Sequence, residues 1–411
     1  MQRFPLRRPR QAVATLVIAS LLGFVCESTR AEADPYYLGV SQSLGHNSNV
    51  FRTVANEVPD KFAVTSLNLG FDQPIGRQRV FANTSIRATR YEDIRTLDNT
   101  GYGVNAGLDW STIGRLSGNL GVSSNRALAN YAASGDQVQI TKRNLETSSQ
   151  ANLRAQLGVA SLLALNAALS HSEISYTAPE YQTSEVRQNV GSIGFTYRPS
   201  GLLTLGGSYR ATRGEYPNVV VPSTGKKESF DRNDVDFTSI WVASGLSTLN
   251  ARLSYGRSVF EGQTLRNVKG ATGSLGWDWK ATGKLAFNTL LSRDSGTETA
   301  LFALANNLGS AVGDNSVQTN AFGFGGTYEA SAKIRATLGT RYARREVLSG
   351  SVLGRDSSSS VALGVSYAAS RSWLLGCNAS RDDSKPLNNT ATVSTRYSAT
   401  QASCNVQFTI R

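Results

Sequence analysis

The sequence predicts an all-β fold: a transmembrane, antiparallel, up-and-down β-barrel of about 18 strands, of the porin-like kind found in bacterial outer membranes. Three observations predict it. Apolar and polar residues alternate along segments of about ten residues, short turns alternate with longer polar stretches, and aromatic residues gather beside the short turns. Beyond the N-terminal segment, no stretch approaches the roughly 18 consecutive apolar residues that a membrane-spanning helix needs.

The first 33 residues have the layout of a secretory signal peptide. Four arginines precede an apolar run over residues 12–25, and Ala31-Glu32-Ala33 offers the small residues of a cleavage site. We therefore expect residues 1–33 to be removed and residues 34–411 to form the barrel in the outer membrane. Cys26 would leave with the signal. The alternative is lipid attachment at Cys26, but Gly23-Phe24-Val25 lacks the small residues that such a site prefers.

Composition excludes several classes of enzyme. The 411 residues include only two histidines and, once the signal is removed, two cysteines. So few histidines and cysteines argue against a histidine-based metal site or a Ser-His-Asp triad. We expect no enzymatic activity, no cofactor and no metal site. The formal net charge is +12, and it stays clearly basic after loss of the signal.

Strand-like alternation is clearest over residues 62–72. One face carries Thr65, Leu67, Leu69 and Phe71, and the other carries Ser66, Asn68, Gly70 and Asp72. Residues 103–110 and 151–157 divide in the same way. Successive side chains of a strand point to opposite faces of the sheet, so each segment has one face for lipid and one for a water-filled lumen.

Eight short connections recur roughly every 40 residues along the chain. They are centred near Ile75-Gly76, Ile113-Gly114, Val159-Ala160, Ser200-Gly201, Gly245-Leu246, Thr282-Gly283, Ala330-Ser331 and Ser370-Arg371. Longer polar stretches separate them, at residues 45–60, 128–145, 216–229, 297–315 and 384–395. Eight hairpins with a first and a last strand make 18 strands, with both chain ends on the short-turn side.

Aromatic residues on the apolar face mark the level of the short turns. They are Phe71, Trp110, Tyr197, Trp277, Trp279, Tyr328, Tyr367 and Trp373. Trp and Tyr have an apolar body and a polar edge, and a membrane interface selects them for that reason. A β-propeller also has repeats of this length, but its blades would need four shorter strands per repeat and a buried second face.

The two cysteines of the mature chain fall in the last two predicted strands. If the final hairpin is centred near residue 390, Cys377 and Cys404 lie nearly opposite each other on the apolar face. The periplasm is oxidising, so we expect a disulfide there. The alternative is a pair of small apolar residues facing lipid.

Basic residues recur on the face predicted to line the pore. They are Arg87, Arg154, Arg210, Arg252, Lys333, Arg335 and Arg341. Charge on the lipid face would be costly, so an inward position is expected for any barrel, and solvated lining is the simplest interpretation. A more specific interpretation is that the pore selects anionic or polyhydroxylated solutes, although the negative charges of Asp72, Asp109 and Asp278 weaken the case for anions. Arg341 and Arg345, near the outer end, could instead contact lipopolysaccharide phosphates.

One short run has acidic side chains at alternating positions. Asp231-Arg232-Asn233-Asp234-Val235-Asp236 offers oxygen ligands for Ca²⁺ but lacks the glycine and the distal Glu of an EF-hand. We therefore expect a solvated strand start there and no metal ion.

Several segments resemble the EpsL-like outer-membrane β-barrel proteins encoded in exopolysaccharide biosynthesis operons. They are Asn49-Val50-Phe51-Arg52, Asp72-Gln73-Pro74-Ile75-Gly76-Arg77-Gln78-Arg79, Gly114-Arg115-Leu116-Ser117-Gly118 with Arg126-Ala127-Leu128, Ser229-Phe230-Asp231-Arg232-Asn233-Asp234, Leu249-Asn250-Ala251-Arg252-Leu253-Ser254-Tyr255-Gly256-Arg257, and Thr282-Gly283-Lys284-Leu285. The resemblance covers essentially the whole mature chain. None of these segments is a catalytic signature.

The resemblance implies a passive conduit that carries an exopolysaccharide chain across the outer membrane beside a periplasmic polysaccharide export protein. Lipopolysaccharide and outer-membrane lipid are the other expected partners, and no nucleic acid is expected. Two further hypotheses use the same fold. One is a general or anion-preferring diffusion porin, and the other is a structural or adhesive surface barrel. A lipid-modifying enzyme is the least favoured, because no catalytic constellation is evident.

Overall fold

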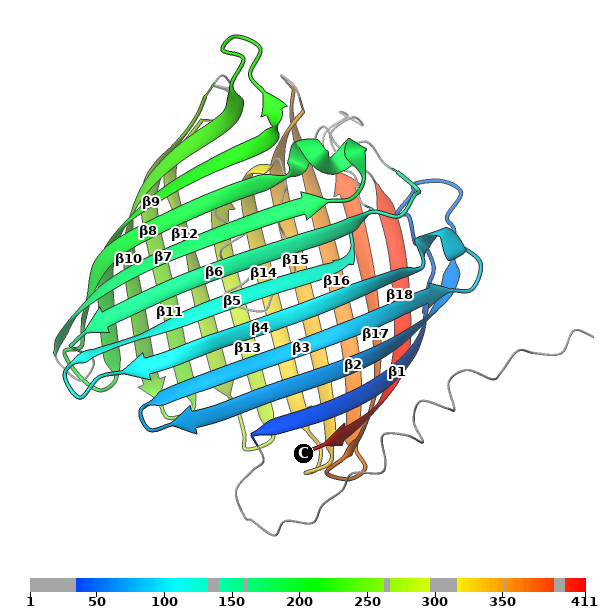
Figure 1. Cartoon of the computed structure of the whole chain (residues 1–411), viewed down its shortest axis with the longest axis horizontal. Helices are drawn as coiled ribbons and strands as arrows, with labels where there is room; N and C mark the ends of the chain where they lie inside the picture. Colours follow the sequence, from blue (N-terminus) through cyan, green and yellow to red (C-terminus); the bar gives the residue numbers. More distant parts are fainter. Residues whose placement is uncertain are drawn as a thin grey trace, which may run out of the picture. The chain divides into compact units, whose positions relative to one another are not determined.

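Figure 1 shows the computed structural model of the chain, in which tilted strands wind round one axis to form a barrel. The structure describes residues 35–131, 140–158, 162–261, 267–295, 316–349, 352–387 and 396–411. The predicted signal peptide lies outside these residues. No helix in the described part of the chain is both long enough and apolar enough to cross a membrane.

The barrel is a single sheet of 18 antiparallel strands, as predicted. The strands are β1 (Tyr36–Asn47), β2 (Asp60–Ile75), β3 (Gln78–Tyr91), β4 (Asn99–Ser111), β5 (Leu116–Leu128), β6 (Leu145–Leu157), β7 (Leu163–Tyr176), β8 (Val186–Tyr197), β9 (Leu203–Val220), β10 (Lys227–Ser244), β11 (Ser247–Phe260), β12 (Val268–Lys280), β13 (Leu285–Ser295), β14 (Ser316–Glu329), β15 (Ile334–Ser349), β16 (Val352–Ala368), β17 (Trp373–Pro386) and β18 (Tyr397–Ile410). Each strand pairs with its sequence neighbours. The register from Leu38↔Ile410 to Asn47↔Gln401 joins β1 to β18 and closes the barrel.

The outer surface of the barrel is the apolar face of the alternating pattern. Leu67, Leu69 and Phe71 of β2 are exposed there, whereas Ser66 and Asn68 face the interior. Large apolar side chains exposed on every side of a closed barrel require a lipid environment, because water would not tolerate so much apolar surface. The barrel therefore spans the outer membrane.

The predicted aromatic girdle is present beside the short turns. Seven of its predicted members are between 39% and 48% exposed, namely Phe71, Tyr197, Trp277, Trp279, Tyr328, Tyr367 and Trp373. Trp277 and Trp279 stack with ring centroids 5.5 Å apart, and Trp279 lies 5.6 Å from Phe287. Aromatic rings at this level mark the periplasmic interface of the membrane.

Seven of the eight predicted short turns lie where the sequence predicts them, and side-chain oxygens stabilise several of them. The eighth, Val159-Ala160, lies outside the described residues. Ser200, Thr282, Ser331 and Ser370 each accept hydrogen bonds from the backbone N–H groups two and three residues later, at 3.0–3.2 Å. A hydroxyl in this position replaces a backbone acceptor and fixes the turn. The same side-chain-to-backbone hydrogen bonds therefore stabilise the turns of four hairpins.

The predicted strict alternation of short turns with long loops is wrong at two hairpins. Residues 221–226 alone join β9 to β10, and β16 begins at Val352, soon after β15 ends at Ser349. The polar stretch 216–229 belongs largely to strands, because backbone pairing continues beyond the apolar belt whatever the side chains are. The hairpin of β9 and β10 consequently stands out at the top of the barrel (Figure 1).

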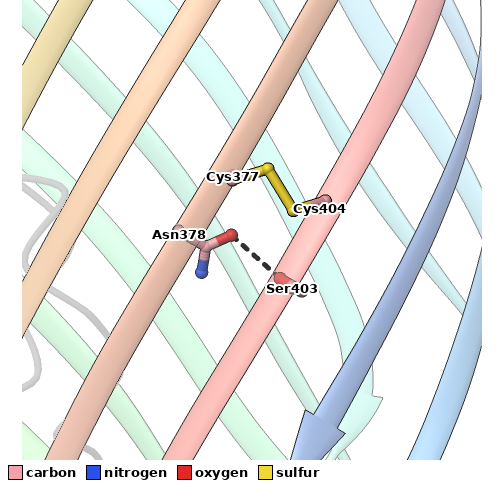
Figure 2. The surroundings of a disulfide bond; sticks show 4 residues. All are labelled: Cys377, Asn378, Ser403 and Cys404. Carbon is pink, nitrogen blue, oxygen red and sulfur yellow. Dashed lines mark hydrogen bonds between the residues drawn. A yellow bond between two sulfur atoms is a disulfide. The ribbon is translucent and has the colours of Figure 1, made fainter.

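A disulfide joins the last two strands on the outer face (Figure 2). Cys377 and Cys404 are direct partners in the register of β17 and β18, with their Cα atoms 4.0 Å apart. The neighbouring pair, Asn378 and Ser403, faces the interior, where the Ser403 hydroxyl donates to Asn378 Oδ1 at 2.8 Å. The bond therefore fixes the register next to the seam where β18 meets β1.

Replacing both cysteines by serine should lower the free energy of unfolding by about 2–4 kcal/mol, because the cross-link restricts the unfolded chain. The barrel should still form, since β17 and β18 keep their backbone pairing. Urea unfolding in detergent, followed by tryptophan fluorescence, measures the difference. Wild-type protein in which both thiols of the native barrel react with iodoacetamide would contradict the bond.

Candidate functional site: the pore wall

The register places six of the seven predicted pore-lining residues on the inner face of the barrel. They are Arg87, Arg154, Arg210, Arg252, Arg335 and Arg341. Lys333 differs from the prediction. It lies in the turn between β14 and β15, and its Nζ donates to the carbonyl of Ala369 at 3.4 Å. It therefore sits at the periplasmic rim rather than on the wall.

Arginines and aspartates form a buried network on the wall of β9 to β13. Arg210 binds Asp236 through two hydrogen bonds of 3.0 and 3.2 Å. Arg232 likewise forms two hydrogen bonds to Asp234, at 2.8 and 2.6 Å, and Arg210 reaches the same carboxylate at 3.3 Å. Such forked contacts are the strongest form of ion pair, and they hold each side chain in one geometry.

The network continues to β11 and β13. Arg252 donates to Ser254 at 2.7 Å and to Asp294 at 3.1 Å, and it lies 3.6 Å from Asp236. The Ser254 hydroxyl also donates to Asp236. Three guanidinium groups and three carboxylates therefore balance one another. A buried charge is tolerated only when it is paired in this way.

Polar atoms without a partner surround this network. Gln188, Thr212, Ser258 and Thr272 are each less than 9% exposed, and one oxygen in each of these side chains has no hydrogen-bond partner. Their strands place all four on the inner face beside the arginines. Buried polar atoms normally bind protein groups or ordered water, so this part of the wall is suited to water or to a polar solute.

Ion pairs also occupy the periplasmic half of the lumen. Arg79 binds Asp72 through hydrogen bonds of 2.8 and 2.5 Å and lies 3.4 Å from Asp109, and Arg335 binds Glu329 at 2.9 Å. Of the predicted basic residues, Arg210, Arg252 and Arg335 thus have carboxylate partners. The predicted net basic lumen is therefore largely compensated. Sequence reasoning placed the arginines on the inner face but did not find their partners.

Arg87 and Arg154 lie on the wall and have no carboxylate partner among the described parts of the chain. Arg87 donates to Asn125 Oδ1 at 2.6 Å. Arg154 is exposed and lines a pocket of about 480 Å³ on the inner wall, with Asn119, Gln156 and Asn166. The pocket is built from amide, hydroxyl and glycine positions around one guanidinium. It can therefore offer hydrogen bonds and a single positive charge to a passing solute.

The wall of β15 to β18 carries a second ionic cluster. Arg345 binds the buried Asp356 at 2.9 and 2.6 Å. Arg52, from the loop between β1 and β2, reaches Asp382 at 3.3 Å and lies over the ring of Tyr397. Arg52 has a positive φ of 53°, a conformation uncommon outside glycine, so the loop bends to bring this side chain to the wall. The loop is thereby tied to β17 and β18.

The suggestion that Arg341 and Arg345 contact lipopolysaccharide phosphates is wrong for this structure. Both residues face the interior, and Arg345 is held by Asp356. The intervening residue, Arg344, faces outward. Successive residues of a strand face opposite sides of the sheet. The side on which a given side chain lies can be predicted only once it is known whether the odd-numbered or the even-numbered residues form the apolar face.

A hydrophobic cluster at the outer mouth was missing from the sequence-based prediction. The described outer loops and strand ends contribute to it Val50, Phe51, Leu97, Ala129, Tyr131, Ile140, Ile174, Tyr176, Ala178, Tyr181, Val186, Tyr216, Phe230 and Phe260. Two short 3₁₀ helices, η1 (Arg95–Leu97) and η2 (Pro179–Ser184), bring Leu97 and Tyr181 into it. These residues come from several loops and strand ends that are far apart in the sequence, so no local pattern reveals the cluster.

Aromatic contacts join the members of this cluster. Phe51 meets Tyr131 edge-on at 5.3 Å, and Phe230 stacks on Phe260 at 5.0 Å. Burial raises the pKa of the Tyr131 phenol, which stays neutral and donates to the carbonyl of Lys142 at 3.0 Å. Phe230 and Phe260 point inward from their strands. The cluster therefore occupies part of the outer mouth of the barrel.

The acidic run at residues 231–236 does not assemble a set of oxygen ligands. Asp231 faces outward, while Asp234 and Asp236 face inward and bind arginines. Within the described residues, no group of three or more His, Cys, Asp or Glu side chains is arranged to hold a metal ion. The alternation of the strand separates the carboxylates that are adjacent in sequence.

No family model matches the chain, and no curated protein matches its sequence. Solved structures with a similar fold include OpdO from Pseudomonas aeruginosa, with 12% identity and a TM-score of 0.49 over 91% of this chain and 97% of that one. Others are OpdK from Pseudomonas aeruginosa with vanillate, at 11% and 0.48 over 91% and 98%, and OccAB2 from Acinetobacter baumannii, at 11% and 0.46 over 91% and 97%.

Replacing Asp234 by Asn should cost about 3–5 kcal/mol of unfolding free energy, because it removes the buried carboxylate that Arg232 binds through two hydrogen bonds. Replacing Glu329 by Gln breaks an exposed pair and should cost no more than about 1 kcal/mol. Equilibrium urea unfolding of both variants in the same detergent measures the contrast. Equal losses would show that the network at β9 to β13 is solvated like the exposed pair.

Proposed function

We propose that the protein is a passive diffusion channel for small hydrophilic solutes across the outer membrane. The observation that carries this proposal is the closed barrel whose inner face is polar and whose internal charges are largely compensated. A wall of this kind offers many weak hydrogen bonds and few strong charges. Solutes can then enter and leave without being trapped, as conduction requires.

A modest preference for anions is part of the proposal. Arg87 and Arg154 lie on the wall with an amide partner and an open pocket respectively, so their charges remain available to solutes. The paired arginines contribute little to the potential along the pore, because each has a carboxylate within hydrogen-bond distance. The preference therefore rests on few residues and should be weak.

The exopolysaccharide conduit remains the alternative that the EpsL-like resemblance implies. The hydrophobic cluster at the outer mouth favours the diffusion channel over it, because packed aromatic rings occupy space that a thick polymer chain would need. A structural or adhesive barrel would rely on a large exposed apolar patch on its loops. Many apolar residues of the described outer loops and strand ends are instead buried together in the cluster at the outer mouth.

Purified protein in liposomes should admit small sugars faster than large ones. We expect swelling rates to fall steadily from a pentose to a trisaccharide, since solutes cross a hydrated opening of limited width. Planar-bilayer recordings should show steady ohmic conductance. Liposomes that swell no faster than empty ones, and bilayers without conductance, would refute a diffusion channel.

The double variant Arg87→Gln/Arg154→Gln should lose about half of the anion-over-cation permeability ratio, because these two charges have no carboxylate to cancel them. The reversal potential across a salt gradient measures the ratio. Arg213→Gln is the matched control, since Arg213 faces outward on β9 and should leave the ratio unchanged. An unaltered ratio in the double variant would remove these arginines from the conduction path.

Deleting the gene in its host separates the channel from the polysaccharide conduit. A diffusion channel predicts unchanged secreted polysaccharide and slower uptake of small solutes. Loss of secreted polymer, with carbohydrate accumulating in the periplasm and rescue by the wild-type gene, would establish the conduit instead.

A further inference from the structure

The outer surface of β13, β14 and β15 carries two arginines near the outer ends of the strands. Arg293 and Arg344 are both direct register partners of Asn320 on the strand between them. All three side chains face outward, and both arginines are exposed. Adjacent strands lie about 4.8 Å apart, so the two arginine backbones are separated by roughly 10 Å and their long side chains can reach one ligand.

An apolar groove of about 620 Å³ begins directly below these arginines. Its lining includes Leu253, Ala271, Leu275, Leu291, Phe322 and Tyr342, with Arg293 and Arg344 as its basic members on the outward face. On each of the three strands, an apolar lining residue lies two positions closer to the membrane centre than the polar residue of the site. The pairs are Leu291 with Arg293, Phe322 with Asn320, and Tyr342 with Arg344. The site thus has a charged outer end and an apolar inner end.

The two guanidinium groups are held in place without being neutralised. Arg344 lies over the Tyr342 ring at 5.6 Å and donates to the Tyr342 hydroxyl at 2.8 Å, and Arg293 donates to Gln318 at 3.0 Å. Neither has a carboxylate within ion-pair distance among the described residues. Both therefore keep a full positive charge and free donors.

Other outward arginines near the outer ends of strands have a different environment. Arg187 binds Glu173 at 2.8 Å, Arg381 binds Asp383 at 3.1 Å and Arg355 binds Glu346 at 3.1 Å. The basic surface at β13 to β15 also continues onto β12 and β11, where Lys269 and Arg257 are direct register partners. Like charges directly opposite each other are destabilising, and an anionic partner would remove that cost.

We propose that this surface binds a phosphorylated glycolipid of the outer leaflet, with a phosphate between Arg293 and Arg344 and an acyl chain in the groove. Guanidinium forks match phosphate oxygens and form charge-assisted hydrogen bonds to them. The position near the outer ends of the strands selects the outer leaflet, since the short turns and the aromatic girdle lie at the other end. Lipopolysaccharide, through its lipid A, has this chemistry.

Native mass spectrometry of the full-length protein in non-ionic detergent, titrated with diphosphorylated lipid A, tests the proposal. Wild type should bind the lipid. The Arg293→Gln/Arg344→Gln variant should bind it at least about tenfold more weakly, because each basic contact with an anionic lipid contributes several-fold in affinity. Arg213→Gln is the matched control, since Asp231 lies directly opposite Arg213 and offers a compensating charge. It should bind like wild type.

Two further arms identify the parts of the ligand. Lipid A without phosphates should bind about as weakly as the double variant binds the phosphorylated form. Ala271→Phe, which fills the exposed groove, should weaken binding of the phosphorylated lipid while leaving both arginines in place. Heat-modifiable migration on SDS gels verifies that each variant is a folded barrel.

Equal affinity of wild type and the double variant for lipid A would overturn the proposal. Equal binding of the phosphorylated and dephosphorylated lipids would do the same. If inorganic pyrophosphate alone bound as tightly as lipid A, the surface would be a simple anion site and the lipid assignment would fail. None of these outcomes bears on conduction, because every residue that is varied faces away from the lumen.

Discussion

Every backbone N–H and C=O at the level of the lipid must find a partner within the protein, and closing the sheet is how a β-structure meets that demand. The pairing of β1 with β18 removes the last two edges, so the remaining features follow from a sheet without ends. Closure separates two faces completely. One meets lipid and the other meets water, and each strand contributes to both through the alternation of its side chains.

The interior then has to accommodate charges that the lipid face cannot carry. Arg232, Asp234, Asp236 and Asp294 are buried, Arg210 and Arg252 are mostly buried, and each guanidinium is matched by a carboxylate. Pairing of this kind offsets the cost of desolvation, so the wall can be both polar and well packed. Arg87 and Arg154 have no carboxylate partner among the described residues, and the proposed anion preference rests on them.

The sequence was sufficient to predict the architecture because alternation and turn chemistry are local properties. The positions of Cys377 and Cys404 even predicted their register in the final hairpin, since antiparallel partners have a constant sum of residue numbers. The partners of the lumen arginines could not be predicted in this way. Asp294 reaches Arg252 from a strand two places away, and Phe51 meets Tyr131 through two loops. Such contacts depend on where the chain lies in three dimensions, and no spacing in the sequence encodes that.

A shift of one residue along a strand decides whether an arginine lies on the inner or the outer surface of the barrel. Arg344 and Arg345 are adjacent, yet Arg345 points inward to Asp356 and Arg344 points outward beside Tyr342. Inward arginines such as Arg210 and Arg345 meet carboxylates on neighbouring strands, because polar side chains of several strands face the lumen. An outward arginine just above the apolar belt has lipid below it and water above it, so its counter-charge has to come from another outward side chain or from the membrane. At Arg293 and Arg344 the described part of the chain supplies no carboxylate, and the phosphates of the surrounding lipid are the source of negative charge that the proposed glycolipid site uses.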